Sequence, residues 1–477
     1  MRIAFLCNHL IRGNIPFGMT TIASFIRNRG HHYDYFNSEL NYELLKSQLQ
    51  AFQPDVIAYS ASSGCIPGYL EINGKLKADF PGIRTIFGGP HPTLAPEMIE
   101  YPSVDAICRG EGEYPFAEYL DALEQGKEPT GIDNLWIKHP DRSIERNKIR
   151  PFLQDLDKLP FPDYSFSEKW EEMRDSRIGY IMASRGCPYM CTYCINHILK
   201  NLAEGQFVRL RSVDNVIAEI KQIVNKYGII YVSFQDDLFA IKVSWLREFA
   251  EKYPREVNLP YSCHLTANRC TPEIADLLKT SGCDMMVIGL ENGDPELREK
   301  YLNKHTTNEE IITSSKLMHE RGIKFVTQNM IGIPGETLQS ALKTIELNIQ
   351  ANPFVLNLWF FQPYPMIKLT EISKKMGVFP RGYEFPPSIS MHMALELPHK
   401  DVMQLLGELS FYLIDHPRRF KVAKYLVKIF GGRWPTVLFL RYLKTLVKVN
   451  RRSFDNYYSK WIKTIRAGED PRSVDLA

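Results

Sequence analysis

Short apolar runs alternate with helical stretches along most of this 477-residue chain, and this alternation limits the possible fold more than any other feature. In the first part of the chain the apolar runs are RIAFL, PDVIAYSA, IRTIFGG and VDAICRG. Helical periodicity follows in FGMTTIASFIRNRG, with Gly30 as the expected C-cap, in residues 66–80 and in EYPFAEYLDALEQG. Buried strands separated by helices predict a parallel, doubly wound α/β sheet, which binds ligands at the carboxyl ends of its strands.

A stretch with three prolines, residues 150–166, shows little periodicity and is predicted to be a linker. After it the alternation restarts with six apolar runs: GYIMAS, YVSFQ, YSCHLTA, MMVIGL, KFVTQNMIG and NLWFFQPY. Helices such as 213–227 and 307–321 lie between them. Six βα units predict a partial or complete barrel with its site at the C-terminal mouth. The expected division is a first domain at 1–140, a linker at 141–170, a barrel at 171–395 and a helical region at 396–477.

The C-terminal region is strongly basic. Between Pro417 and Arg466 the chain holds fourteen Lys or Arg and one acid, Asp455, a net charge of +13. Because the whole chain carries +3, the remainder carries −10. No apolar run approaches the roughly 18 residues that a membrane span needs, and the N-terminus lacks the pattern of a signal peptide. We therefore expect a cytoplasmic protein whose cysteines stay reduced.

Three of the nine cysteines lie close together in SRGCPYMCTYCIN, residues 184–196, directly after a predicted strand. Cys187, Cys191 and Cys194 have the spacing C-x3-C-x2-C. A structural zinc site normally shows two CxxC pairs or histidine partners, and a closed iron–sulfur cluster normally uses four thiolates. Three thiolates on one loop suit a [4Fe–4S] cluster with one iron left open. The alternatives are a structural metal site and buried thiols without ligands.

The spacing of the cysteines, with the aromatic Tyr193 before the third one, resembles the signature of radical S-adenosylmethionine (SAM) enzymes. In that family the open iron binds the amino and carboxylate groups of SAM. Reduction of the cluster then cleaves SAM to methionine and a 5′-deoxyadenosyl radical, which takes a hydrogen from the substrate. The resemblance implies a partial (β/α)6 barrel, in agreement with the six βα units, and makes the three cysteines the metal ligands and catalytic residues.

Two acidic motifs resemble SAM contacts of the same family. FQDDLF ends the second barrel strand, where the resemblance implies that Asp236 and Asp237 contact the methionine end of SAM; a pair of helix N-caps is the alternative. GLENG resembles the ribose motif G-x-E-S-G, with Asn292 in place of serine. Glu291 would then accept hydrogen bonds from both ribose hydroxyls, which suits a carboxylate. An ordinary surface carboxylate is the alternative.

The segment GIPGET, residues 332–337, follows the fifth barrel strand and resembles the family's adenine-side motif. The resemblance implies SAM contacts at Gly332, Ile333 and Gly335. The two glycines would let the backbone approach the ligand closely. Taken alone, the segment is an ordinary turn.

Two glycine-rich loops follow predicted strands of the first domain, in FGGPHPTLAPE and CRGEGEYPF. Their glycines are Gly88, Gly89, Gly110 and Gly112, and a plain turn is the alternative for each loop. Ahead of a radical SAM core, the two loops together resemble the Rossmann-like cobalamin-binding domain of cobalamin-dependent radical SAM proteins. The resemblance makes the four glycines cobalamin contacts.

The cobalt-ligating motif D-x-H-x-x-G of many cobalamin domains is not matched by NHLIRG, which lacks the Asp and has one residue too many between His9 and Gly13. We therefore assign no lower cobalt ligand to His9, and we expect His91 to be a turn histidine. The other six cysteines show no second ligand spacing and are expected to be small buried side chains. Facing the pocket is the alternative for Cys263.

The resemblance implies a cobalamin-dependent radical SAM methyltransferase that acts on an unactivated carbon of a small, lipid-like or natural-product substrate. Its cofactors would be a [4Fe–4S] cluster, SAM and cobalamin, and an electron donor such as flavodoxin or ferredoxin would reduce the cluster. A radical rearrangement or oxidative cyclisation is the second hypothesis, and a non-catalytic iron–sulfur redox sensor is the third. The apolar and aromatic FFQPYPMIKL, residues 360–369, suggests a bulky or greasy substrate, with ordinary barrel packing as the alternative.

Three interpretations of the basic region stay open. It can cover the acidic body and close the barrel with its apolar face, lie on an anionic membrane surface, or bind nucleic acid. We favour the first, and nucleic acid is the least favoured. Membrane contact would make the protein peripheral at the membrane surface and a lipid-like substrate attractive. GGRWP, residues 431–435, is expected to break the basic segment 418–452 into two helices.

Overall fold

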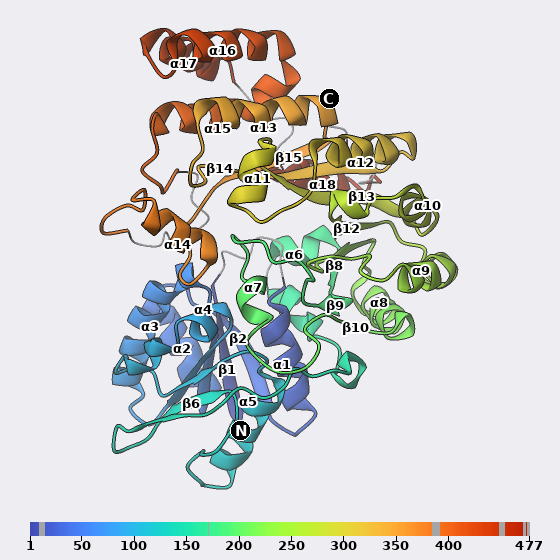
Figure 1. Ribbon diagram of the computed structural model, residues 1–477. Coiled ribbons are helices and arrows are strands. Elements are labelled where there is room, and N and C mark those ends of the chain that lie inside the picture. The colour runs from blue at the N-terminus through green and yellow to red at the C-terminus, as the bar shows by residue number, and fades with distance from the viewer. Residues whose placement is uncertain (9–14, 170, 384–391, 448–453, 471–473, 475–477) are drawn as a thin grey trace.

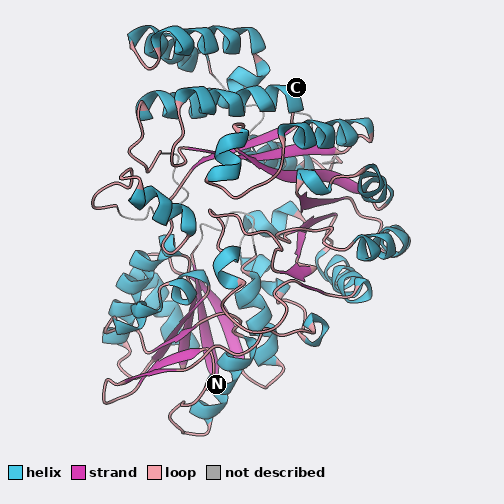
Figure 2. Ribbon diagram, in the orientation of Figure 1, coloured by secondary structure: helices cyan, strands magenta, loops and turns pink. Residues whose placement is uncertain are grey.

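The computed structural model describes residues 1–8, 15–169, 171–383, 392–447, 454–470 and 474. Figure 1 shows an N-terminal α/β domain, a second α/β unit above it, and a group of C-terminal helices at the far end. Figure 2 shows that each α/β unit is built around its own sheet. The expected fold class, two successive α/β units followed by helices, is confirmed.

The first sheet has seven strands in the order β2-β1-β3-β4-β5-β6-β7. The first five positions are parallel, whereas β6 and β7 run antiparallel to their neighbours. The strands are β1 Arg2–Cys7, β2 His32–Asn37, β3 Val56–Ser60, β4 Arg84–Gly88, β5 Ala106–Cys108, β6 Leu135–Lys138 and β7 Ile144–Arg146. The helices are α1 Phe17–Arg27, α2 Tyr42–Phe52, α3 Ile66–Asp79, α4 Pro90–Leu94 and α5 Glu113–Glu124.

Three strands of this sheet lack the apolar run that predicts the other strands. The edge strand β2 reads HYDYFN and is largely half-exposed, so it shows no buried run. Strands β6 and β7 are short and form an antiparallel extension, and β7 lies beyond residue 140, within the stretch predicted as a linker. Helix α1 ends with a C-cap at Asn28, two residues before the expected Gly30, which adopts a positive φ of 89°.

The rest of the predicted linker is packed between the two α/β units rather than exposed. Phe152, Tyr164 and Phe166 are buried. The Tyr164 hydroxyl lies 2.7 Å from the carbonyl oxygen of Tyr180 and 2.6 Å from a carboxylate oxygen of Glu219. Aromatic side chains therefore fix a segment whose prolines and weak periodicity suggest a loose connection.

The second sheet has six parallel strands in the order β15-β14-β13-β12-β11-β8. Among the residues that the structure describes, β8 and β15 do not pair with each other, so the barrel is partial, as expected. The strands are β8 Ile178–Ile181, β11 Tyr231–Phe234, β12 Tyr261–Leu265, β13 Cys283–Glu291, β14 Lys324–Ile331 and β15 Val355–Phe360. A small antiparallel pair, β9 Ser184–Arg185 and β10 Arg209–Leu210, flanks the first strand.

Local signals in the sequence fix the barrel helices. Helix α8 begins after the N-cap Ser212 and ends at Gly228, which has a φ of 62°. Helix α12 begins with a capping box between Thr307 and Glu310. The helices of this unit are α6 Glu171–Ser176, α7 Asn196–Leu199, α8 Val213–Tyr227, α9 Val243–Glu256, α10 Pro272–Thr280, α11 Pro295–Lys300, α12 Asn308–Glu320, α13 Leu338–Ala351 and α14 Lys368–Lys375.

The C-terminal region forms four helices: α15 Lys400–Asp415, α16 Pro417–Phe430, α17 Trp434–Leu446 and α18 Phe454–Arg466. Gly431 ends α16, so GGRWP breaks the region as expected. On α18, Tyr457 and Trp461 pack against residues near the starts of the barrel strands, including Tyr231 and Val355. This part of the region closes the end of the barrel opposite its mouth. No helix in the described part of the chain is long and apolar enough to cross a membrane.

We predict that Tyr164→Phe lowers the thermal unfolding midpoint. The substitution removes the hydroxyl beside the fully buried Glu219, and an unsatisfied buried polar group costs about 1–3 kcal/mol. In a unit of this size that corresponds to a shift of about 2–10 °C. Tyr101→Phe, at a residue that is 51% exposed, is the matched control. Equal midpoints for the two variants would contradict the anchoring role of Tyr164.

Candidate active site

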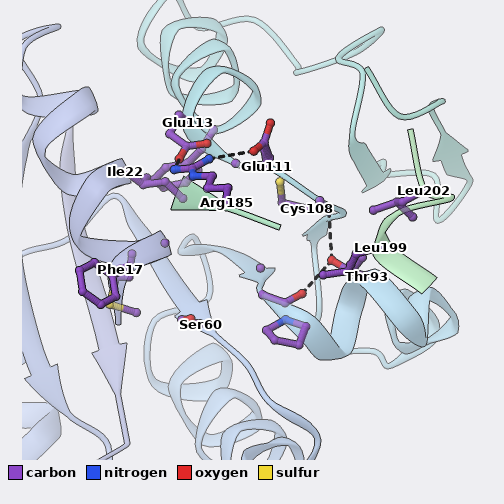
Figure 3. A pocket seen from close by; sticks show the side chains of 18 of the residues that line it. Phe17, Ile22, Ser60, Thr93, Cys108, Glu111, Glu113, Arg185, Leu199 and Leu202 are labelled. Carbon is purple, nitrogen blue, oxygen red and sulfur yellow. Dashed lines mark hydrogen bonds and ion pairs between the residues drawn. The ribbon is translucent and has the colours of Figure 1, made fainter. Parts of the chain in front are cut away.

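A cavity of about 390 Å³ lies between the first domain and the barrel (Figure 3). One wall is formed by the ends of the strands β4 and β5 and by helix α1, and the other by the chain on both sides of the three cysteines. Apolar side chains line much of it, with Phe17 and Ile22 on one side and Leu199 and Leu202 on the other. This is the carboxyl edge of the first sheet, where ligands of parallel α/β sheets bind.

All four glycines predicted as cobalamin contacts line this cavity. Gly89 has a φ of 98°, and a Cβ atom there would lie 3.0 Å from the backbone nitrogen of Ala61. Thr93 connects the two glycine loops, because its hydroxyl donates to the Gly89 carbonyl (2.8 Å) and accepts from the Gly110 N–H (3.0 Å). At Gly112 a Cβ atom would lie 2.8 Å from the end of the Ile22 side chain. At the four glycine positions the loops therefore present backbone to the cavity.

These walls fit a large, flat and partly apolar group such as a corrinoid. None of the described residues that line the cavity is a histidine. His91 lies on the short helix α4 rather than in the expected turn, with its Nδ1 3.1 Å from the Ser63 hydroxyl. His9 lies outside the described residues. No described histidine is therefore placed to bind a metal from this wall.

Two carboxylates and two guanidinium groups join the walls of the cavity. Arg185 donates to Glu111 (2.9 Å) and to Glu113 (2.5 Å), and Arg209 donates to Glu111 (2.9 Å). Glu113 and Arg209 are each 4% exposed. Burial opposes both charges, but attraction to the carboxylates raises the pKa of Arg185 and the guanidinium groups lower that of Glu111. Residues 111 and 113 alternate with Gly110 and Gly112, so this ion cluster holds the glycine loop against β9 and β10.

The three cysteines lie on the loop between β9 and α7, and all three are half-buried. The loop is held by the segment after α11: Thr192 N–H donates to the Leu302 carbonyl (3.1 Å), and the Thr192 hydroxyl donates to the Tyr301 carbonyl. Asn303 donates to the Met190 carbonyl (2.9 Å). Backbone contacts thus fix a loop that has almost no regular secondary structure.

The three thiols lie close enough to one another to interact electrostatically. Burial raises the pKa of Cys194 to about 12, with smaller contributions from Asp237 and from the other two thiols. No group of three His, Cys, Asp or Glu side chains in the described residues is arranged around a single metal ion. A [4Fe–4S] cluster makes a different demand, because its thiolates bind separate iron atoms at the corners of a cube. The donor set, three desolvated thiols on one loop, fits such a cluster.

The two aspartates of FQDDLF point in different directions. Asp236 is buried and accepts hydrogen bonds from the Ala183 N–H (3.1 Å) and from the Ser184 hydroxyl. Burial raises the pKa of Asp236 to about 7. Asp237 instead lines the cavity and accepts a hydrogen bond from Asn196 (3.0 Å). Of the pair, only Asp237 stands beside the cysteines, whereas Asp236 positions the strand that leads to them.

Glu291 ends β13 with a φ of 63° and lies beside Lys304, with 3.4 Å between carboxylate and ammonium. Tyr193 interacts electrostatically with Glu291 and forms a hydrogen bond with Cys191, and burial raises its pKa. Lys304 also lowers the pKa of Cys191, against the larger effect of burial. Glu291, Tyr193 and Lys304 therefore gather on the barrel side of the cysteine loop. Lys304 lies thirteen residues after Glu291 on an irregular segment, and no motif in the sequence singles it out.

The GIPGET turn is held from within the protein. Glu336 is buried and accepts hydrogen bonds from the N–H groups of Gly332 (2.5 Å) and Ile333 (3.2 Å) and from Asn292 (2.7 Å). A Cβ atom at Gly335 would lie 2.7 Å from the Tyr301 ring, and one at Gly332 would lie 3.2 Å from Met393.

Protein side chains thus occupy the space on the Cβ side of both glycines, and the expected contact of their backbone with SAM stays a prediction. The Ile333 side chain is buried in the core. Asn292, the residue that replaces the usual serine, is fully buried and holds Glu336. The turn directly follows β14, whose Asn329 pairs with Glu291 of β13.

The other six cysteines lie apart from the loop that carries Cys187, Cys191 and Cys194. Five of them are buried, and Cys65 is half-buried. Cys263 is 1% exposed and lies 4.0 Å from the Cys283 sulfur, so it belongs to the core and not to the pocket.

Two family models match the chain in the order of its two α/β units. The B12 binding domain matches residues 14–120, and the radical SAM superfamily matches residues 181–347. The second match contains all three cysteines, and the first contains both glycine loops. The chain is therefore a radical SAM protein with an N-terminal B12-binding domain, and its resident cofactors are a [4Fe–4S] cluster, SAM and cobalamin.

The chain is also similar to several named proteins. An uncharacterized methyltransferase, PH0819, of Pyrococcus horikoshii is 28% identical over 363 residues, which cover 75% of this chain and 78% of the relative. An anaerobic magnesium-protoporphyrin IX monomethyl ester cyclase of Rubrivivax gelatinosus is 24% identical and covers 87% of this chain and 75% of its own. Among solved structures, the radical SAM methyltransferase TsrM of Kitasatospora setae superposes with a TM-score of 0.63 at 19% identity, over 79% of this chain and 76% of that one. This last likeness shows the fold alone.

We predict that Arg185→Met lowers the unfolding midpoint and weakens cobalamin binding. It leaves the buried Glu113 without its partner, and breaking a buried ion pair in this way costs about 3–5 kcal/mol. The double variant Arg185→Met/Glu113→Gln removes both charges and should recover part of the stability. Thermal unfolding of the three proteins measures this, with hydroxocobalamin binding as the second readout. A double variant no more stable than Arg185→Met would show that the pair is not coupled.

We predict that Gly112→Val weakens cobalamin binding, because the new side chain must displace Ile22 at the cavity wall. Overpacking of about 1–3 kcal/mol corresponds to about a ten- to hundredfold loss of affinity. Gly82→Val is the matched control, since a Cβ atom there meets nothing within 4 Å and the residue lies away from the cavity. Equilibrium dialysis with hydroxocobalamin gives the affinities. Unchanged binding by a folded Gly112→Val protein would remove this loop from the cobalamin site.

Proposed function

We propose that the protein is a cobalamin-dependent radical SAM methyltransferase that methylates an unactivated carbon of a small molecule. One observation carries this proposal: the glycine loops of the B12-binding domain and the chain around the three cysteines line the same cavity. When bound, the cluster supplies the electron that cleaves SAM and cobalamin supplies the methyl group. A shared cavity lets both cofactors reach one substrate carbon.

The chain's own residues would bind and orient these groups. Cys187, Cys191 and Cys194 would hold the cluster, and Asp237 would stand beside them as a polar contact for the methionine end of SAM. Glu291 would accept hydrogen bonds from the ribose, with Lys304 orienting its carboxylate. Asp236 and Glu336 would act indirectly, by holding the two loops in place.

The glycines of the first domain would receive the corrin ring, and the apolar walls would exclude water from it. Phe17 and Ile22 on one side, and Leu199 and Leu202 on the other, are placed for this role. Water exclusion protects reactive intermediates from side reactions. We further propose that a small electron-transfer protein such as a flavodoxin or a ferredoxin reduces the cluster.

A radical cyclase is the second candidate, favoured by the likeness to the Rubrivivax gelatinosus cyclase. The methyltransferase is preferred because the more similar Pyrococcus horikoshii relative is named as one. The products separate the two. Methylation of cobalamin by SAM leaves S-adenosylhomocysteine, whereas cleavage of SAM at the cluster leaves 5′-deoxyadenosine.

We predict that anaerobically reconstituted protein, given SAM and a strong reductant, forms both products. Mass spectrometry of the mixture measures them, with protein lacking cobalamin as the control that should form 5′-deoxyadenosine alone. If the complete protein yields only 5′-deoxyadenosine, the cyclase becomes the better assignment. The double variant Cys191→Ala/Cys194→Ala should lose the cluster's visible absorbance and all SAM cleavage.

Cys65→Ala is the matched control for that variant, because Cys65 is also half-buried but lies outside the loop. It should keep the absorbance and the cleavage. SAM cleavage that survives in the double variant would overturn the assignment of these thiolates as cluster ligands.

A further inference from the structure

Helices α16 and α17 form a hairpin, residues 417–446, whose outer face is apolar and exposed. Seven of the thirteen exposed large hydrophobic side chains among the described residues lie on this hairpin. They are Val422, Tyr425, Ile429, Phe430, Trp434, Leu438 and Tyr442. Trp434 is 72% exposed and Tyr425 is 62% exposed, so these are not side chains at the edge of a core. A concentration of this kind marks a contact surface.

The spacing of these residues shows one continuous face. On α16 they follow at intervals of three and four residues (Val422, Tyr425 and Ile429), and on α17 at intervals of four (Trp434, Leu438 and Tyr442). The opposite sides of both helices pack inward, with Phe420, Ala423 and Val427 on α16 and Thr436, Leu440 and Leu443 on α17 buried. The hairpin thus has a face for the protein body and a second face without a partner in the described structure.

The charge of the hairpin is of one sign. It carries eight Lys or Arg residues and no Asp or Glu. Lys424 pairs with Glu346 and Lys444 with Glu408, both on the body. Among the described residues, Arg418, Lys421, Lys428, Arg433 and Arg441 form no ion pair, and all five are exposed. The partner of this face must therefore be apolar and anionic at once.

We propose that the outer face of the α16–α17 hairpin docks on an anionic phospholipid bilayer. Aliphatic side chains would enter the outer edge of the hydrocarbon, and Trp434, Tyr425 and Tyr442 would sit at the headgroup level, where amphipathic rings are favoured. The unpaired cations would bind anionic headgroups, and their long side chains can extend past the apolar contacts to reach them.

Two other occupants fit less well. A second copy of the chain would bring two sets of like charges face to face across a two-fold axis, with no acid on the hairpin to neutralise them. Nucleic acid would satisfy the cations and stack on the aromatic rings, but it would leave Val422, Ile429 and Leu438 in water. The hairpin lies at the end of the molecule away from the B12-binding domain (Figure 1), so docking leaves the cavity between the domains uncovered.

The test is co-sedimentation of the full-length protein with vesicles of phosphatidylcholine alone or with phosphatidylglycerol added. We expect binding to the anionic vesicles, weakened by high salt, and at least about tenfold weaker binding to neutral ones. Trp434→Ser/Leu438→Ser should bind anionic vesicles about tenfold more weakly than the natural chain. Leu44→Ser/Tyr101→Ser removes two exposed apolar side chains from the first domain and should bind normally.

No binding to anionic vesicles at low salt, in protein with a normal melting profile, would overturn the proposal. Equal binding by both double variants would do so as well. A dimer in sedimentation velocity that Trp434→Ser/Leu438→Ser dissolves would assign the face to a second copy instead. Binding is measured without SAM or substrate, so the result is independent of the proposed methyl transfer.

Discussion

Four charged side chains between the domains determine how the two halves of the site face each other. Arg185 belongs to the strand that leads into the cysteine loop, while Glu111 and Glu113 belong to the loop that carries Gly110 and Gly112. Taking such charges out of water costs several kcal/mol for each ion, so the cluster is stable only when all its partners are in place. A shift of one loop against the other would leave a carboxylate buried and unpaired. The arrangement therefore favours one relative position of the two domains, and the cavity between them keeps one shape.

The same principle recurs inside the barrel, where buried carboxylates hold loops by accepting hydrogen bonds. Asp236 holds the chain at Ala183 and Ser184, just before the cysteines, and Glu336 holds the turn at Gly332. Burial raises the pKa of both carboxyls to about 7, because the charged form of a carboxyl group loses its hydration when water is excluded. Each of these two loops is thus supported by a buried carboxyl group.

The sequence was sufficient for the parts of the fold that leave a periodic or spaced signal. All six barrel strands and both named helices of the barrel lie where the apolar runs and caps indicate, because those strands are buried on both faces. Strand β2 is an edge strand in which only Tyr35 and Phe36 are buried, and it is held by pairing with β1 rather than marked by an apolar run of its own. The packed state of the 150–166 segment depends on Tyr164 meeting Glu219 across 55 residues, which no local pattern reveals.

The spacing of the motifs identified the loops that form the candidate site, but it did not reveal the structural role of every residue in them. The glycines of both first-domain loops and the chain on both sides of the three cysteines line one cavity, and the sequence pointed to both sets of loops. It could not tell that Asp236 faces the protein while Asp237 faces the cavity, because neighbouring residues beyond a strand share composition but not direction. Nor could it tell that Glu111 and Glu113 pair with Arg185. The alternation of glycine and glutamate in RGEGE was the available signal, since carboxylates that are buried between the glycines of one loop need cationic partners.

The C-terminal region shows how one stretch can serve two purposes that its composition does not distinguish. Trp461 on α18 closes the base of the barrel, whereas Trp434 on α17 stands in solvent, although both lie among Lys and Arg residues. The net charge of +13 over residues 417–466, against −10 on the remainder, gives the molecule a strong electrical asymmetry. An anionic surface attracts the hairpin and repels the acidic remainder of the protein. The protein therefore approaches the surface with the hairpin first, before any apolar contact forms. The exposed aromatic and aliphatic side chains then meet the bilayer first, and the B12-binding domain, at the other end, stays in water.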